Sequence, residues 1–135
     1  TAFSYLETNV KENNSSVKPV MADALKICDT FADGELDLIV SNPPYIKSAD
    51  IATLQKEVQL EPRLALDGGE DGYDFYREIV SRWSRKLKKG GALAFELGEN
   101  QADAVKTLMT DKGFSDFKIS LDFGGVQRAI IGTLL

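Results

Sequence analysis

Histidine is absent from the sequence, and cysteine occurs only once among its 135 residues. Acid–base catalysis by an imidazole group is therefore excluded, and we expect no metal site, since zinc prefers imidazole and thiolate ligands. Cys28 cannot form a disulfide within the chain, which fits a reducing, cytoplasmic setting. No histidine is present to activate it, so we interpret Cys28 as a small, half-buried residue and not as a nucleophile.

Long apolar runs and an excess of basic charge are also missing. No run approaches the roughly 18 apolar residues of a membrane-spanning helix, so we expect no membrane partner. The 16 basic and 21 acidic residues give a net charge of −5, which argues against direct nucleic-acid binding because phosphates attract a basic surface. No signal peptide is visible and the chain does not begin with Met, so we expect the numbering to start inside a longer protein.

The clearest functional signal lies between residues 37 and 46. Apolar residues predict a buried strand over 36–41, and the chain then runs directly into Asn42, Pro43, Pro44 and Tyr45. Each proline fixes its own φ, and Pro43 pushes Asn42 toward an extended conformation, so this corner is stiff. We call these four residues the Asn-Pro-Pro-Tyr corner. In open α/β sheets, ligands bind at the carboxyl ends of strands, where this corner is expected to lie.

The corner has the groups to bind a planar amino group. The side-chain oxygen of Asn42 and the carbonyl oxygen of Pro43 can accept both hydrogens of an NH2 group, and the ring of Tyr45 can stack against its plane. Such a site would aim a weak nitrogen nucleophile at an electrophilic carbon. The alternative is a plain structural turn with Tyr45 as core filler.

Hydrophobic periodicity places the corner within an α/β chain. It predicts helices over 1–14, 24–31, 73–89 and from Asn100 to Gly113, a short helix within 47–60, and strands over 17–21, 36–41, 92–97, 117–121 and 129–135. The turn between the last two strands is short, so we expect them to be antiparallel. Residues 1–135 are expected to form a single domain. The basic residues near 82–89 suit the end of a helix dipole, with an acidic partner or RNA as the alternative.

Several further stretches extend the pattern. The sequence resembles the release-factor glutamine N5-methyltransferases (the HemK/PrmC family) from about Asp23 to its end. The stretches that carry the resemblance are Asn42-Pro-Pro-Tyr-Ile46, Glu61-Pro-Arg-Leu-Ala-Leu-Asp-Gly-Gly69, Asp71-Gly72, Phe95-Glu-Leu-Gly98, Gln101 and Asp122-Phe-Gly-Gly-Val-Gln-Arg128.

This resemblance implies a Rossmann-like fold that uses S-adenosylmethionine, of which the chain would be the C-terminal portion of the catalytic domain. The first two strands of that fold and its Gly-rich cofactor loop are not found in the sequence, because Gly68-Gly69 and Gly90-Gly91 follow an irregular segment and a helix. We therefore expect an incomplete sheet with an exposed strand edge. Alone, the chain is expected to bind the cofactor weakly or not at all and to be inactive.

The resemblance also implies roles for individual residues. The family methylates the glutamine of the Gly-Gly-Gln loop of peptide-chain release factors. By analogy, Asn42 and Pro43 would bind the substrate amide, Tyr45 would pack on it, and Pro44 would keep the corner rigid. The resemblance also implies that Glu61 contacts the substrate and that Asp23, Ala24 and Asn42 contact the cofactor. Glu61 could instead be a solvated loop residue, and Asp23 could cap a helix.

Two other functions remain open at this stage. The same corner occurs in enzymes that methylate adenine or cytosine in DNA or RNA, which must flip the base out of its stack. The acidic composition and the stretch from Glu61 to Gly72 weigh against that reading. The third reading is a non-catalytic interaction module, favoured by the missing cofactor loop and disfavoured by the intact corner.

Overall fold

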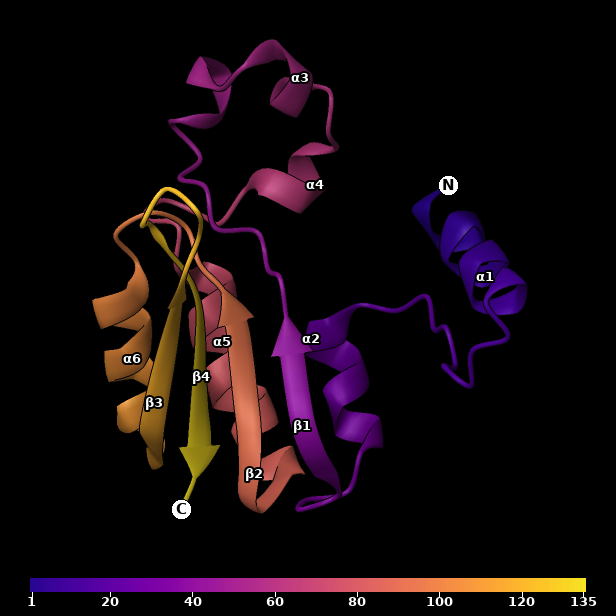
Figure 1. Ribbon diagram of the computed structural model, residues 1–135, viewed down its shortest axis with the longest axis vertical. Coiled ribbons are helices and arrows are strands. Elements are labelled where there is room, and N and C mark those ends of the chain that lie inside the picture. Colours follow the sequence, from indigo (N-terminus) through magenta and orange to yellow (C-terminus); the bar gives the residue numbers. More distant parts are fainter.

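The computed structural model describes residues 1–135, which form a four-stranded mixed sheet with helices on one face (Figure 1). The strands are β1 (Leu36–Ser41), β2 (Leu87–Glu96), β3 (Phe114–Leu121) and β4 (Gln127–Leu134), in the spatial order β1-β2-β4-β3. β1 and β2 run parallel, whereas β4 pairs antiparallel with both β2 and β3. The predicted α/β class and the antiparallel pair at the end of the chain are confirmed.

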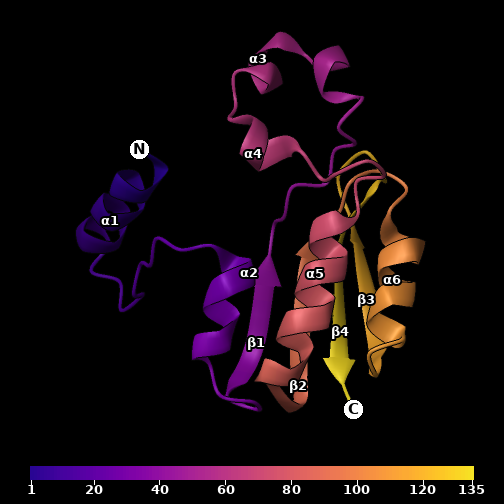
Figure 2. The ribbon, with the colours of Figure 1, turned by 180° about the vertical axis from the view of Figure 1, so that it is seen from behind.

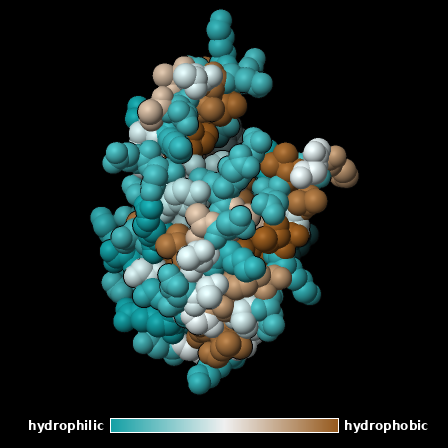
Figure 3. Space-filling view, turned by 90° about the vertical axis from the view of Figure 1, so that its left-hand side faces the viewer, coloured by the Kyte–Doolittle hydropathy of each residue, from teal (hydrophilic) through white to brown (hydrophobic).

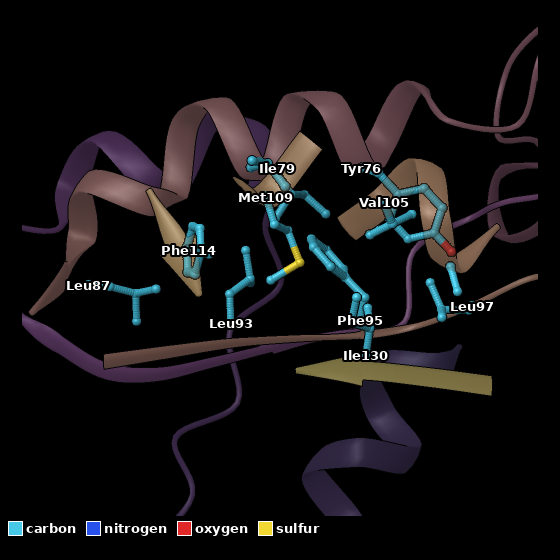
Figure 4. Packing of buried hydrophobic residues seen from close by; sticks show 12 residues of the cluster. Tyr76, Ile79, Leu87, Leu93, Phe95, Leu97, Val105, Met109, Phe114 and Ile130 are labelled. Carbon is cyan, nitrogen blue, oxygen red and sulfur yellow. The ribbon is translucent and has the colours of Figure 1, made fainter. Parts of the chain in front are cut away.

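The helices α5 (Asp74–Trp83) and α6 (Ala102–Thr110) cover one face of the sheet (Figures 1 and 2). The apolar residues of α5 recur at helical spacing and place Tyr76, Ile79 and Val80 against the sheet, where all three are buried. The Tyr76 ring meets Phe95 of β2 edge to face at 5.2 Å between centroids. Figure 4 shows these side chains packing with Val105 and Met109 of α6 and with Leu93 and Ile130 of the sheet.

The edge strand β1 leaves apolar side chains in solvent. Leu38 and Val40 are 54% and 69% exposed, while Ile39 between them packs on the core. Alternation along a strand puts Leu38 and Val40 on the face opposite the core, so this face and the free edge of β1 are both open. The exposed strand edge expected from the sequence is confirmed.

A lobe formed by residues 47–66 projects beyond the carboxyl end of β1 (top of Figure 1). It contains the short helices η2 (Ile51–Thr53), α3 (Lys56–Gln59) and α4 (Arg63–Leu66). In the side view, brown apolar side chains reach the surface of the lobe at the top of the molecule (Figure 3). The lobe therefore adds an apolar surface to the end of the sheet where the corner is expected.

The N-terminal part departs from the prediction. Residues 17–21 form no strand, because Pro19 cannot donate a ladder hydrogen bond and no neighbouring strand pairs with this stretch. The preceding helix α1 (Ala2–Glu12) has no buried residue. The helix predicted over 24–31 is a short α2 (Ala24–Ile27) followed by the 3-10 turn η1 (Cys28–Thr30), and Cys28 is buried instead of half-buried. None of the helices has the length and apolar character needed to cross a membrane.

The helix predicted over 73–89 is also too long. α5 ends at Trp83, a 3-10 turn η3 (Ser84–Lys86) follows, and β2 begins at Leu87, five residues earlier than predicted. Leu87 is buried and pairs with Leu36 of β1, so strand pairing outweighs the local helical preference of this basic stretch.

Four of the five basic residues of that stretch, all but Lys89, form ion pairs within the chain. Lys86 is only 4% exposed, and its ammonium group donates to the Phe31 carbonyl oxygen at 2.7 Å and to Asp33 at 2.8 Å. The hydrogen bond from Lys86 to Asp33 is the main reason that the pKa of Asp33 lies below its usual value. Arg85 pairs with Asp29 at 3.3 Å. These contacts hold the chain before β1 against the end of α5, so a free cationic patch for an acidic partner is not formed there.

Candidate active site

The Asn-Pro-Pro-Tyr corner follows the last residue of β1, at the carboxyl end of the parallel strand pair. Pro43 is buried and anchors the turn, Tyr45 is half-buried, and Asn42 is exposed. No hydrogen bond within the chain engages the side-chain amide of Asn42 or the carbonyl oxygen of Pro43. Neither group is used within the chain, and their role toward a ligand stays a prediction.

Tyr45 is oriented by a contact with β2. Its hydroxyl group donates to Oε1 of Glu96 at 3.1 Å. Partial burial, followed by this bond to a carboxylate, raises the pKa of the Tyr45 phenol. Tyr45 therefore stays protonated at neutral pH, and its ring is held at both ends, by the backbone of the corner and by Glu96. Glu96 is not among the site residues predicted from the sequence.

Three glycines allow the chain to pack closely around Tyr45. A Cβ atom on Gly68 would lie 2.8 Å from the Tyr45 Cα atom, and one on Gly72 would lie 2.6 Å from the Tyr45 carbonyl oxygen. On Gly98, a Cβ atom would come within 2.9 Å of Cδ2 of the Tyr45 ring. A side chain at any of these positions would push Tyr45 aside. These glycines are part of the stretches that carried the family resemblance.

Gln101 joins the corner to its surroundings and was missed as a functional residue. Its side chain is 7% exposed, with Oε1 accepting from the Gly98 N–H group at 2.9 Å. Its Nε2 atom donates to the carbonyl oxygens of Tyr45 at 3.1 Å and Gly72 at 3.3 Å. The Tyr76 hydroxyl lies 3.1 Å from Oε1. A glutamine that bridges three loops and a helix has no local pattern that would reveal it.

The start of α6 also differs from the prediction. The helix was expected to begin at Asn100, but it begins at Ala102 with Gln101 as its N-cap residue, and Asn100 has a positive φ of 62°. Asparagine tolerates this left-handed conformation better than most residues, so Asn100 serves as the turn that delivers Gln101 to the buried position. The predicted helix exists, but its first residues are used to build the site.

Two hollows meet at Asn42 and Glu96. A cleft of about 540 Å³ on the open side of the sheet is lined by Val40, Ser41, Asn42, Ala94, Phe95, Glu96, Arg128 and Ala129. A second hollow of about 340 Å³ lies between the corner and the lobe, lined by Asn42, Pro43, Tyr45, Ile46, Val58, Glu61, Ala65, Leu66 and Glu96. The structure thus brings Glu61 to the corner across 16 residues of sequence.

The lobe is closed at its base by hydrogen bonds next to the corner. The Ile46 N–H group donates to the Leu66 carbonyl oxygen at 3.0 Å, and the Gly68 N–H group donates to the Ile46 carbonyl oxygen at 2.7 Å. Asp67 accepts a hydrogen bond from the Ser48 hydroxyl, which is the main reason that its pKa is lowered. The lobe and the corner are therefore coupled, and Glu61 sits on an anchored loop.

A cation borders the site from the start of β4. Arg128 lines the larger cleft, and its Nε atom donates to Asp122 at 2.9 Å. Asp122 also accepts from the backbone N–H groups of Gly124 at 2.8 Å and Val126 at 3.0 Å. The Val126 contact, and then Arg128, lower the pKa of Asp122. These contacts fix the turn before β4 and hold Arg128 beside the cleft.

Asp23 and Ala24 lie outside both hollows. Asp23 caps α2, with Oδ1 accepting from the Leu25 N–H group at 2.9 Å, so the capping alternative is confirmed. The Ala24 carbonyl oxygen accepts from the indole N–H of Trp83 at 3.0 Å. α2 begins at the end of the molecule to which β1 points (Figures 1 and 2). The two residues share that end of the sheet with Asn42, and their role toward a cofactor stays a prediction.

Comparison with known proteins places these features in context. No protein-family model matches the chain. A release factor glutamine methyltransferase from Geobacter sulfurreducens is 47% identical over 107 residues, which are 78% of this chain and 38% of that protein. The chain spans less than half the length of the curated relatives that it matches, between 28% and 46% for the first eight.

Solved structures are similar in fold. A methyltransferase from Pyrococcus furiosus superimposes with a TM-score of 0.68 at 23% identity, over 97% of this chain and 56% of that one. A release-factor-specific protein-(glutamine-N5) methyltransferase from Alicyclobacillus acidocaldarius gives a TM-score of 0.50 at 26% identity, over 82% of this chain and 54% of its own. The methyltransferase fold predicted from the sequence is therefore confirmed.

Proposed function

This chain is homologous to one segment of the release factor glutamine methyltransferases, and we propose on that basis that it supplies the amide-binding half of such an active site. The reaction moves a methyl group from S-adenosylmethionine to the side-chain N5 nitrogen of a glutamine in a peptide-chain release factor. We take the target to be the glutamine of the Gly-Gly-Gln loop. The homology covers most of this chain but under half of each relative, so the activity belongs to the complete protein.

The observation that carries the proposal is the pair of free acceptors at the corner. The Asn42 side-chain oxygen and the Pro43 carbonyl oxygen accept no hydrogen bond within the chain, and Asn42, Pro43 and Tyr45 line the same hollow. Two acceptors can bind both hydrogens of a glutamine NH2 group, which leaves the nitrogen lone pair pointing away from them. Because Pro43 and Pro44 keep the corner rigid, the bound nitrogen is oriented for in-line attack on the methyl carbon.

The proposed transfer needs no catalytic base. A carbon–nitrogen bond forms between the glutamine N5 atom and the methyl carbon as the bond from that carbon to sulfur breaks. The sulfur takes up the bonding pair and becomes a neutral thioether, and the nitrogen loses one proton to solvent as the methyl group arrives. Positioning and exclusion of water carry most of the rate enhancement. Asn42 and Pro43 stabilise the positive charge that develops on the nitrogen.

The residues of this chain fit only part of the cofactor. S-adenosylmethionine supplies an electrophilic methyl group on a cationic sulfur. Oδ2 of Asp23 accepts no backbone hydrogen bond and lies 3.7 Å from the Lys26 ammonium group, so it is available to the amino group of an adenine ring. The backbone at Ala24 would lie next to that ring. The sequence of residues 1–135 has no Gly-rich loop after a strand for the amino-acid end, and we expect weak cofactor binding by this chain alone.

The charges around the smaller hollow favour an amide substrate over a nucleic acid. The charged residues that line it, Glu61 and Glu96, are both acidic. Carboxylates can accept hydrogen bonds from peptide N–H groups that flank the target glutamine, whereas the phosphates of DNA or RNA would be repelled. We therefore place the release factor ahead of a nucleic acid and ahead of a non-catalytic role, and we expect no direct nucleic-acid contact.

The test is methyl transfer by the complete protein carrying Asn42→Ala. We expect turnover on a release factor to fall by about 100-fold or more because the amide nitrogen is no longer aimed, while S-adenosylmethionine affinity measured by calorimetry falls far less, because the proposed contacts of Asp23 and Ala24 remain. Asn9→Ala on the exposed face of α1 is the matched control and should keep full turnover. Equal turnover of the Asn42→Ala variant would refute the role of the corner, and methylation of nucleic acid but not of a release factor would refute the substrate.

A further inference from the structure

We propose that Gln101 is a positioning residue for the Asn-Pro-Pro-Tyr corner, and that its amide must present its oxygen to Gly98 in the loop after β2 and to Tyr76 of α5, and its nitrogen to the corner. The inference rests on the proposed function, since it names a further residue that the same site needs. Gln101 does not line either hollow and touches no substrate, so it acts through Tyr45.

The orientation of the Gln101 amide is determined by its partners. The Gly98 N–H group can only donate, so the atom 2.9 Å from it is the oxygen Oε1. The carbonyl oxygens of Tyr45 and Gly72 can only accept, so the atom near both is the nitrogen Nε2. Both hydrogens of Nε2 are thus used, and Oε1 also lies 3.1 Å from the Tyr76 hydroxyl. No carboxylate, hydroxyl or apolar side chain of this size can satisfy all four partners.

Burial makes this arrangement specific. Because Gln101 is only 7% exposed, the carbonyl groups of Tyr45 and Gly72 have little access to water where they meet its side chain. Removal of Nε2 therefore leaves both carbonyl groups without a partner. Gly98 permits the arrangement, because a Cβ atom there would lie 2.6 Å from Oε1 of Gln101. The Tyr76 hydroxyl also lies 2.8 Å from the carbonyl oxygen of Glu96, the residue whose side chain binds the Tyr45 hydroxyl.

The consequence for the reaction concerns the last residue of the corner. Tyr45 is held at its carbonyl by Gln101 and at its hydroxyl by Glu96. Without the hydrogen bond from Gln101, the backbone after Pro44 is free to shift, and the Pro43 carbonyl and the Tyr45 ring no longer keep their common geometry. Such a shift mainly affects alignment in the transition state. We therefore expect kcat to fall more than KM rises.

The experiment compares three variants of the complete protein in methyl transfer to a release factor. Gln101→Met keeps the volume and removes every hydrogen bond. Gln101→Glu keeps the acceptor for Gly98 and Tyr76 but places an oxygen against the carbonyls of Tyr45 and Gly72. Gln55→Met, at an exposed position without a side-chain capping bond, is the matched control. We expect kcat to fall by about 10- to 100-fold in both Gln101 variants with KM changed less than about threefold, and no change in the control.

The pH dependence separates positioning from general disruption of the structure. When the carboxyl group introduced by Gln101→Glu is protonated, it regains one donor toward Tyr45 or Gly72. Burial favours this neutral form. Relative to wild type at each pH, this variant should recover activity as the pH falls, and Gln101→Met should not. A constant ratio across pH, or kcat equal to wild type in both variants, would overturn the proposal.

Hydrogen exchange provides a readout that does not depend on the substrate. Gln101→Met should speed amide exchange at Ile46 and Gly68, which close the base of the lobe, and leave the β3–β4 ladder unchanged. If wild type fails to methylate a release factor but this local change appears, the proposed function fails and the positioning role stands. Unchanged exchange at both amides would overturn the positioning role itself.

Discussion

A single added methyl group at Gly98 should disturb the site without altering the backbone. A Cβ atom there would lie 2.6 Å from Oε1 of Gln101 and 2.9 Å from Cδ2 of Tyr45, both closer than van der Waals contact. Gly98 does not have a positive φ, so Gly98→Ala introduces no backbone strain, and any effect comes from this overlap. Gln101 and Tyr45 cannot both keep their positions.

The expected magnitude follows from overpacking. Added methylenes in a packed region cost about 1–3 kcal/mol, which corresponds to about 5- to 150-fold faster local opening at 25 °C. Exchange of the Ile46 and Gly68 amides in the complete protein should rise by that factor, and turnover should fall by about 10-fold or more because the corner moves. Hydrogen-exchange mass spectrometry and a methyl-transfer assay measure the two effects.

Gly124→Ala is the control for this prediction. Gly124 also lacks a positive φ, and its nearest atom to an added Cβ is Oδ1 of Asp122 at 3.3 Å, a tight but tolerable contact. We expect the Ile46 and Gly68 amides of the Gly124→Ala variant to exchange at the wild-type rate. Wild-type exchange and turnover in Gly98→Ala would show that the close packing around Tyr45 and Gln101 does not hold the corner, and the reasoning would be refuted.

Two further predictions concern Tyr45 and Asp71. Tyr45→Phe keeps the ring but removes the bond to Glu96, and should lower kcat/KM by about 2- to 12-fold, as expected for the removal of one hydrogen bond; an unchanged value would remove Glu96 from the positioning of the ring. Asp71 bonds Arg77, which lowers its pKa to about 2. A lowered pKa means that this ion pair stabilises the fold above the ordinary pKa of 3.8, and that the stabilisation disappears as pH falls from there toward about 2. A carbon-detected NMR titration of Asp71 should show this, and an ordinary value would contradict the ion pair.

Local patterns predicted much of the fold. The strand over 36–41, the stiff corner after it and the apolar stripe of α5 depend on neighbouring residues or on a single periodicity, and all three appear in the structure. The short Gly124-Gly125 turn likewise required the last two strands to be antiparallel, as they are. Asn42, Pro43 and Tyr45 could be proposed because their chemistry is contiguous in sequence.

Other features were decided by partners far along the chain. Residues 17–21 have strand-forming valines but no neighbouring strand, and Leu87 joins β2 because it is buried opposite Leu36. The basic residues near 82–89 were expected to suit the end of a helix dipole, yet Lys86 lies beyond α5 and is buried against Phe31 and Asp33. Periodicity cannot detect such contacts, because it reports only which side of an element is apolar.

The sequence by itself determined the groups present at the corner: two prolines stiffen it, Asn42 and the Pro43 carbonyl supply acceptors, and Tyr45 supplies a flat face. Only the tertiary structure decided what surrounds it. Glu61, Glu96 and Gln101 lie 16 to 56 residues after Tyr45, and each bears on the corner only because the sheet, the lobe and α6 converge at one end of the molecule. Side-chain identity is local information, whereas the satisfaction of buried carbonyl groups by Gln101 depends on long-range packing.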